Sequence, residues 1–176
     1  MNDGGGDPTK EFLQRMGAVE RDLTHPEVEP RDAATLILID RSGSEPRVLL
    51  GRRHPDSKFM PGKFVFPGGR TELHDRAMPA ISELHPDAET KLLTRVRETP
   101  PNYARGFPLA ALRETAEETG LLVGVKRDQP PQSPDGLWEE FAKAGVHPDL
   151  GQFYFVTRAI TPPGRNRRFH ARFFTA

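Results

Sequence analysis

The chain has 176 residues, no cysteine, and 25 basic against 25 acidic residues. The absence of cysteine excludes disulfides, thiolate metal sites and a cysteine nucleophile, and the balanced charge gives no global field that would attract nucleic acid or a membrane surface. No stretch approaches the ~20 consecutive apolar residues of a membrane span. We therefore expect a single cytoplasmic domain that binds neither nucleic acid nor membrane.

The first part of the chain is expected to hold a tail, a helix and a β-hairpin. Residues 1–8 are polar and glycine-rich, which predicts disorder, and the single domain then covers 9–176. Apolar residues at three- and four-residue spacing predict an amphipathic helix over 9–22. The apolar, β-branched run 33–40 predicts a buried strand, and 47–52 predicts the strand that returns after a turn.

A glycine-rich segment follows this hairpin. Residues 64–66 are predicted to form a short strand between Gly62 and the pair Gly68-Gly69. Because glycine has no Cβ, the pair lets its backbone lie very close to another chain segment or to a ligand. Many such runs are simple turns, so the pair by itself identifies no site.

Helices and strands alternate in the rest of the chain. Their interleaving predicts an α/β (α+β) fold with a mixed β-sheet and helices packed on it. The expected helices are 87–96 with Asp87 as N-cap, 107–119 and 137–144, and the expected strands are 121–125, 152–160 and 168–174.

The helix over 107–119 ends in an unusual group of acidic residues. Glu114 shares a helix face with Glu117 and Glu118, three and four positions on. Acidic side chains are disfavoured at the C-terminal end of a helix, and Arg113 alone cannot neutralise three of them. A hard divalent cation with oxygen ligands, Mg²⁺ or Mn²⁺, would do so. A solvated acidic helix face remains the alternative.

The spacing of these residues resembles the box of the Nudix hydrolase family, G-x5-E-x7-R-E-x-x-E-E-x-G followed by an apolar residue. Asp75 stands six residues after the first glycine, where the family has Glu. The second half of the box follows only after 30 extra residues, at roughly 76–106, which form an insertion. The matching residues are Gly69, Arg113, Glu114, Glu117, Glu118, Gly120 and Leu121.

Such an insertion within the box makes the chain similar to the coenzyme A diphosphatase branch of the family. The resemblance implies a Nudix-type mixed sheet sandwiched by helices, with an inserted helical segment. Whether the insertion caps the site or forms the arm of a homodimer stays open. Family members usually continue beyond the last predicted strand, so we also expect a shortened or truncated C-terminus.

The resemblance also implies roles for the acidic residues and their neighbours. Glu118 and Glu114 would be the principal metal ligands, and Glu117 another ligand or a base that acts through water. A backbone oxygen near Gly68 would complete the metal site. Arg113 would orient the carboxylates, with a simple surface ion pair as the alternative. Asp75 is one methylene shorter than Glu, so it would reach the metal only through water, with a direct contact as the alternative.

Three basic residues are candidates for binding substrate phosphates, because Arg offers planar two-point contacts and Lys a point charge. They are Arg52, Arg53 and Lys63, and a solvated strand edge is the alternative for them. Trp138 and Phe141 are expected in the core. Four of the six histidines show no metal-ligand spacing and are expected in surface or packing positions: His54, His74, His85 and His170.

The activity that the resemblance implies is hydrolysis of the pyrophosphate bond in a nucleoside diphosphate linked to another group, with Mg²⁺ or Mn²⁺ as cofactor. Coenzyme A or an acyl-CoA is the leading candidate for this nucleotide-containing substrate. The alternatives are an ADP-ribose or NADH pyrophosphatase and a non-catalytic, Nudix-like nucleotide-binding module. The split box and Asp75 motivate the last of these, and the three crowded carboxylates argue against it.

Overall fold

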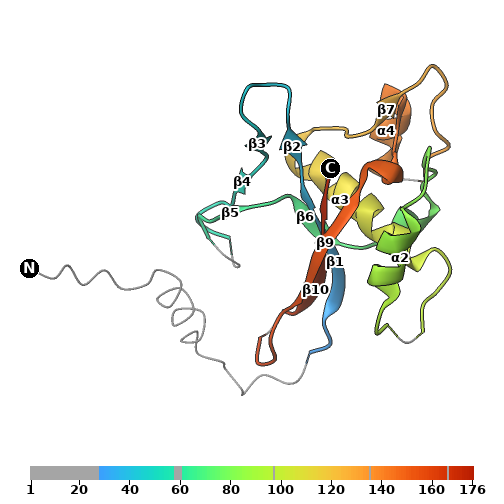
Figure 1. Cartoon of the computed structure of the whole chain (residues 1–176). Helices are drawn as coiled ribbons and strands as arrows, with labels where there is room; N and C mark the ends of the chain where they lie inside the picture. Colours follow the sequence, from blue (N-terminus) through green and yellow to red (C-terminus); the bar gives the residue numbers. More distant parts are fainter. Residues whose placement is uncertain (1–27, 58–60, 97, 135, 166) are drawn as a thin grey trace, which may run out of the picture.

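The computed structural model describes residues 28–57, 61–96, 98–134, 136–165 and 167–176 (Figure 1). The tail predicted over 1–8 and the helix predicted over 9–22 lie outside these residues. No helix in the described ranges is long and apolar enough to cross a membrane.

A four-stranded mixed sheet forms the centre of the molecule (Figure 1). Its strands lie in the order β6 (Gly68–Arg70), β1 (Arg31–Ile37), β10 (Phe169–Thr175) and β9 (Tyr154–Ile160). β1 runs parallel to β10, whereas the two outer strands are antiparallel to their neighbours. The two strands predicted at the end of the chain are confirmed within two residues at each boundary.

Three short strand pairs surround the central sheet. They are β2 (Ile39–Asp40) with β3 (Arg47–Val48), β4 (Gly51–Arg52) with β5 (Phe64–Val65), and β7 (Val125–Lys126) with β8 (Val146–His147). The predicted hairpin is confirmed by β2 and β3. Its returning strand over 47–52 is divided, however, because β4 pairs with β5 instead of continuing along β2.

The strand predicted over 121–125 is wrong for all but its last residue. Leu122 and Val123 pack against the core from a segment that belongs to no strand. Their apolar character therefore reflects burial and not membership of the sheet. Gly124 lies so close to β8 that an added Cβ would be 2.9 Å from Cγ1 of Val146.

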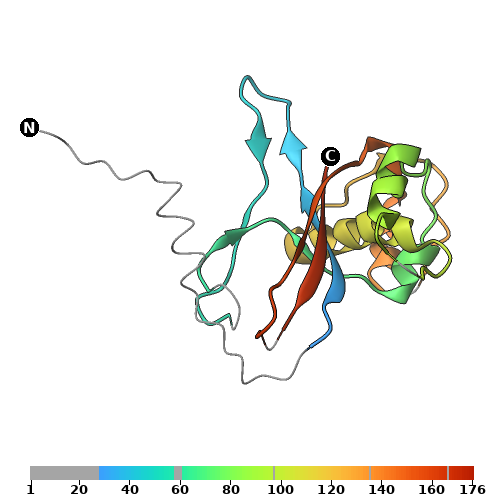
Figure 2. The same cartoon turned by 60° about the horizontal axis from the view of Figure 1, so that its bottom comes forward.

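Three α-helices, α2 (Pro86–Leu93), α3 (Tyr103–Thr119) and α4 (Trp138–Ala144), lie on the same side of the central sheet (Figures 1 and 2). Two short 3-10 helices accompany them, η1 (Leu73–Ala77) and η2 (Leu150–Gln152). α3 begins four residues earlier than predicted. Asn102, with φ of 59°, precedes it, and Pro108 is accepted as its sixth residue instead of in its first turn.

The insertion packs against the beginning of α3. α2 contacts α3 and β9, and Arg158 on β9 donates to the carbonyl of Thr94 at 2.9 Å. The predicted N-cap Asp87 is wrong: His85 occupies that position, and its Nδ1 accepts from the backbone N–H of Asp87. The described part of the insertion thus lies along the first half of α3, away from the acidic second half.

The core lies between α3 and the helix-facing side of the sheet. Leu109 and Leu112 of α3 and Leu36 and Phe174 of the sheet are fully buried, and truncating such a residue costs about 2–5 kcal/mol. The prediction that Trp138 and Phe141 belong to the core is confirmed, since both side chains are fully buried. This packing fixes the orientation of α3 and therefore which of its faces meets β6.

Candidate active site

The acidic residues lie in the last two turns of α3, beside β6. Gly120 ends the helix with φ of 74°, a left-handed conformation that glycine adopts without strain, and donates its N–H to the carbonyl of Ala116 at 2.8 Å. Glu114, Glu117 and Glu118 therefore keep the helical spacing predicted from the sequence. Their side chains face Arg113 or the glycine pair of β6.

Arg113 is buried at the centre of this acidic group, only 4% exposed. Its Nη1 donates to Glu117 at 2.7 Å and to Glu114 at 3.1 Å, and its Nη2 donates to the carbonyl of Arg70 at 2.8 Å. Burial alone would lower the pKa of Arg113, but the carboxylates of Asp75, Glu117 and Glu114 together raise it. A buried guanidinium with these partners orients carboxylates and is not a surface ion pair.

Asp75 lies on the opposite side of Arg113 from the glutamates. Arg113 donates to its two carboxylate oxygens, from Nε to Oδ1 at 2.8 Å and from Nη2 to Oδ2 at 3.2 Å. The backbone N–H of Glu72 and the indole N–H of Trp138 donate to the same carboxylate. Since four donors already surround it, the geometry favours a supporting role for Asp75 and gives no support to a direct metal contact.

The glycine pair is required by close contacts on both sides of β6. A Cβ at Gly69 would overlap the carboxylate of Glu114, and a Cβ at Gly68 would lie 2.7 Å from the Cα of Thr35 on β1. Gly68 also donates its N–H to Oε2 of Glu118 at 3.2 Å. The pair thus brings a backbone against both α3 and β1, as its composition indicated.

Two of the glutamates have a raised pKa. Burial raises the pKa of Glu114, although Arg113 partly offsets the effect. Burial also raises the pKa of Glu118, against the lowering effects of the Gly68 N–H and of the charge of Arg53. Both carboxyl groups therefore lose their protons less readily than they would in water, and a bound cation would oppose this effect by stabilising the ionised forms.

The three glutamates offer the oxygen ligands that a divalent cation needs, but their side chains do not converge on one point. Within the described ranges, no three Asp, Glu or His side chains are grouped as a metal site. The reason is visible in the contacts: Glu114 and Glu117 turn toward Arg113, and Glu118 turns toward Gly68. The donors are nonetheless all carboxylate oxygens on one short stretch of helix, which is the ligand type that Mg²⁺ and Mn²⁺ prefer.

The three basic candidates lie on or beside the paired strands β4 and β5 but differ in exposure. Arg53 is half-buried, and its charge acts on Glu118. Arg52 and Lys63 are exposed, and the Arg52 guanidinium lies 6.0 Å from the ring centroid of Phe64. The backbone N–H of Arg53 donates to the carbonyl of Lys63 at 2.9 Å, so the two chain segments are joined. Arg53 is thus the candidate that the structure brings to the acidic group.

A groove of about 470 Å³ opens beside Arg113 and Glu117. His74, expected as a surface or packing residue, lines it and contacts Glu72 through Nε2 at 2.8 Å. Glu72, His74 and Trp138 are neighbours of the site that sequence reasoning did not identify. The position of Glu72 and His74 within three residues of Asp75 was the available signal. The rest of the lining comes from α4 and the segment before it: Gly136, Leu137 and Glu140.

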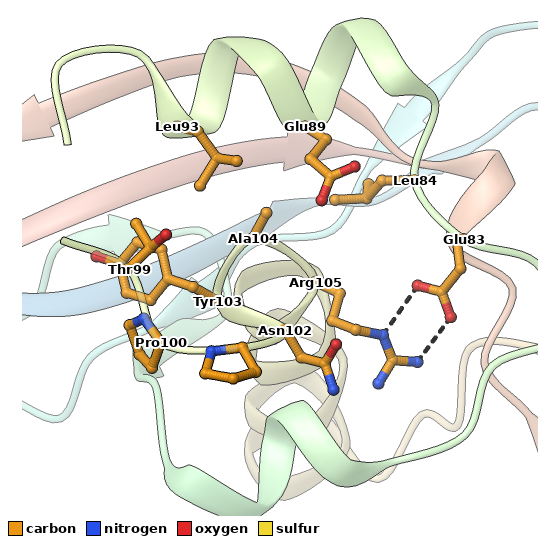
Figure 3. Close-up of a pocket in the computed structure, with 11 residues that line it drawn as sticks. Glu83, Leu84, Glu89, Leu93, Thr99, Pro100, Asn102, Tyr103, Ala104 and Arg105 are labelled. Carbon is orange, nitrogen blue, oxygen red and sulfur yellow. Dashed lines mark hydrogen bonds and ion pairs between the residues drawn. The ribbon is translucent and has the colours of Figure 1, made fainter. Parts of the chain in front are cut away.

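A larger pocket of about 740 Å³ lies within the insertion, between α2 and the start of α3 (Figure 3). Glu83 and Arg105 close one end of it with a two-point ion pair, both contacts at 2.9 Å. At 1.5 Å per residue along α3, Ala104 in its wall is about 15 Å from Glu114. Arg113 and Glu117 border the smaller groove, so we assign the candidate active site there.

The chain is similar to a solved structure described as a NUDIX hydrolase from Alicyclobacillus acidocaldarius. The two share 30% sequence identity with a TM-score of 0.63, and the match covers 85% of this chain and 70% of the other. No family model matches the sequence. The fold and this similarity define the class of the protein, a hydrolase. The chain belongs to the Nudix hydrolase family.

Proposed function

We propose that this Nudix hydrolase cleaves the pyrophosphate bond of a nucleoside diphosphate linked to another group, with Mg²⁺ or Mn²⁺ bound by Glu114, Glu117 and Glu118. The observation that carries the proposal is the position of Arg113, which is buried between Asp75 and two of these glutamates. A buried guanidinium that fixes the direction of carboxylates is expected where those carboxylates bind a ligand. A solvated acidic helix face has no need of one.

The chemistry that a divalent ion supplies when bound is neutralisation of phosphate oxygens and a lowered pKa of a coordinated water. The chain's own part in the reaction is positioning. Arg113 keeps Glu114 and Glu117 apart and aimed in fixed directions, and Gly68 holds Glu118 through its N–H. Absence of a side chain at Gly69 leaves room for Glu114 beside β6. We assign the backbone carbonyl of Gly68 as a further oxygen ligand.

Glu117 is the candidate for the general base. It is the glutamate that borders the groove, so a proton taken from an attacking water could leave through open space. Its contact with Arg113 at 2.7 Å would keep the carboxylate pointing in one direction during the transfer.

Arg53, with Arg52 and Lys63 on the adjoining segments, is proposed to bind the substrate phosphates. The effect of the Arg53 charge on Glu118 supports its place near the scissile bond. Coenzyme A and acyl-CoA are the substrates we propose first, since the insertion within the box is the feature that this chain shares with that branch. ADP-ribose and NADH are the alternatives within the same reaction class.

The test is a substrate panel with purified protein and Mn²⁺ or Mg²⁺. Coenzyme A, an acyl-CoA, ADP-ribose, NADH and a dinucleoside polyphosphate are incubated separately, and released mononucleotide is measured by chromatography. We expect metal-dependent release from at least one of them and near-complete loss with Glu118→Gln. If none of the five is cleaved in the presence of either metal, the proposal fails. If only ADP-ribose or NADH is cleaved, the proposed substrate changes from coenzyme A to that compound, and the reaction class stays the same.

A further inference from the structure

Trp138, the first residue of α4, is joined to the candidate active site through a single polar contact. The side chain is fully buried, and its indole N–H donates to Oδ1 of Asp75 at 3.3 Å. A buried indole N–H normally finds such a partner. Asp75 is 63 residues away in sequence, so the contact ties α4 to the short helix η1, which carries Asp75.

The carboxylate of Asp75 has four donors, two for each oxygen. Oδ1 accepts from Nε of Arg113 and from Trp138, and Oδ2 accepts from the backbone N–H of Glu72 and from Nη2 of Arg113. Two acceptor sites on each oxygen are the ordinary capacity of an ionised carboxylate. Trp138 therefore supplies the one contact that Arg113 and the backbone leave open, and the carboxylate is held from three directions.

The position of Arg113 depends on this carboxylate. Two of the three guanidinium nitrogens of Arg113 are bound to Asp75, and the third, Nη1, reaches Glu117 and Glu114. A rotation of the carboxylate would be passed to the guanidinium through its two-point contact, and from there to the glutamates. The contacts form one continuous path from α4 to the acidic end of α3.

We infer that Trp138 is a positioning residue of the hydrolase, which acts through Asp75 and Arg113 on Glu114 and Glu117. The inference rests on the proposed function, because it assumes that these glutamates bind the metal. It also accounts for the aspartate at the position where the family box has Glu. The shorter side chain leaves space for an indole donor, and a longer one in this fully buried place would push against Arg113 or Trp138.

A purely packing role for Trp138 makes different predictions. Its ring lies 4.9 Å from the ring of Phe141, which is equally buried on the same helix but has no polar contact with Asp75. Trp138→Phe removes the N–H and keeps an aromatic ring, whereas Phe141→Leu disturbs the same core and leaves the N–H in place. The two variants form a matched pair that separates loss of packing from loss of the polar contact.

The experiment measures the Mn²⁺ affinity of both variants by calorimetry and the solvent exchange of the Arg113 Nε–H by NMR. We expect Trp138→Phe to weaken Mn²⁺ binding roughly tenfold, the low end of the cost of removing an outer partner of a metal ligand. Exchange of the Arg113 Nε–H should accelerate. On a cleaved substrate, kcat should fall with KM nearly unchanged. Phe141→Leu should lower the melting temperature to a similar extent without these changes.

The inference is overturned if Trp138→Phe leaves Mn²⁺ affinity and Arg113 exchange unchanged, or if Phe141→Leu alters them equally. Neither readout needs turnover, so this outcome is distinct from failure of the substrate panel. Should Trp138→Phe not fold, the wild-type chain still provides a test. Trp138 is its single tryptophan, so its indole N–H resonance is unambiguous. That resonance should shift on titration with Mg²⁺, and a resonance that does not respond contradicts the coupling.

Discussion

Arg113 and Asp75 form a buried two-point ion pair although they are 38 positions apart in the chain, with Nε to Oδ1 at 2.8 Å and Nη2 to Oδ2 at 3.2 Å. The insertion lies between the two residues in sequence, and the pair joins the halves of the box across it. A guanidinium and a carboxylate in this fork geometry fix each other's orientation as well as their separation.

Replacing one member of this pair should be costly. We expect Asp75→Asn to lower the free energy of unfolding by about 3 kcal/mol, because it leaves a buried guanidinium without its main counter-charge. Urea unfolding followed by circular dichroism measures the change. Asp87→Asn, an exposed change on α2, is the control and should stay within about 0.5 kcal/mol of the wild type. Equal stability of the two variants would contradict the structural role of the pair.

Glu118→Gln should reduce kcat by more than about 100-fold. Loss of an outer partner of a metal ligand already costs 10–100-fold, and Glu118 is proposed as a direct ligand. The melting temperature measured without metal should change little, because Gln keeps the length of the side chain and an oxygen that can accept from the Gly68 N–H. Glu139→Gln, on the exposed side of α4, is the matched control and should retain wild-type turnover.

Gly69→Ala should separate metal binding from folding. The added Cβ would overlap the end of the Glu114 side chain, which is flexible and can swing away, so we expect less than about 1 kcal/mol of lost stability. The displaced carboxylate should weaken Mn²⁺ binding at least about tenfold. Gly51→Ala on β4 has no neighbour closer than 4.0 Å and serves as the control. Unchanged Mn²⁺ affinity in Gly69→Ala would remove Glu114 from the ligand set.

His170 should make the stability of the fold depend on pH below neutrality. Burial, together with the charge of Arg172, lowers the pKa of His170 from its ordinary value of 6.5. Between the lowered folded value and 6.5 the unfolded chain binds more protons, so the stabilising contribution is complete above pH 6.5 and is lost as the pH falls through the folded pKa.

Melting temperatures recorded from pH 7.5 down to pH 5 test this prediction. The wild type should lose stability over that interval, and His170→Gln, which cannot titrate, should show a flatter profile. A profile of His170→Gln that runs parallel to that of the wild type would assign the pH dependence to other groups.

The spacing of the acidic residues carried most of what could be predicted about the site. Glu114, Glu117 and Glu118 lie where a 3.6-residue period places them, and Arg113 adjoins them, because helix geometry is local. The mixed sheet and the hairpin were also predictable from local sequence, because alternating or continuous apolar runs indicate buried strands. The close packing of Gly68 and Gly69 against neighbouring segments was also predictable, because glycine has no Cβ.

The features that were not predictable depend on contacts between distant segments. Nothing in the local sequence indicates that Trp138 would donate to Asp75, or that β4 would leave β3 to pair with β5. The start of α3 was misplaced because Pro108 is tolerated only with the support of tertiary packing. The apolar segment around Leu122 shows that burial without a strand partner gives the same pattern as a strand.

The end of α3 at Gly120 also affects how fast metal arrives. The last carbonyl groups of the helix carry partial negative charge, and Glu118 is only two residues away. Together with Glu114 and Glu117 they create a local negative potential on a chain whose formal net charge is zero. Attraction of this kind extends over roughly one Debye length, about 10 Å at 0.1 M salt. The association rate of divalent cations should accordingly fall as ionic strength rises.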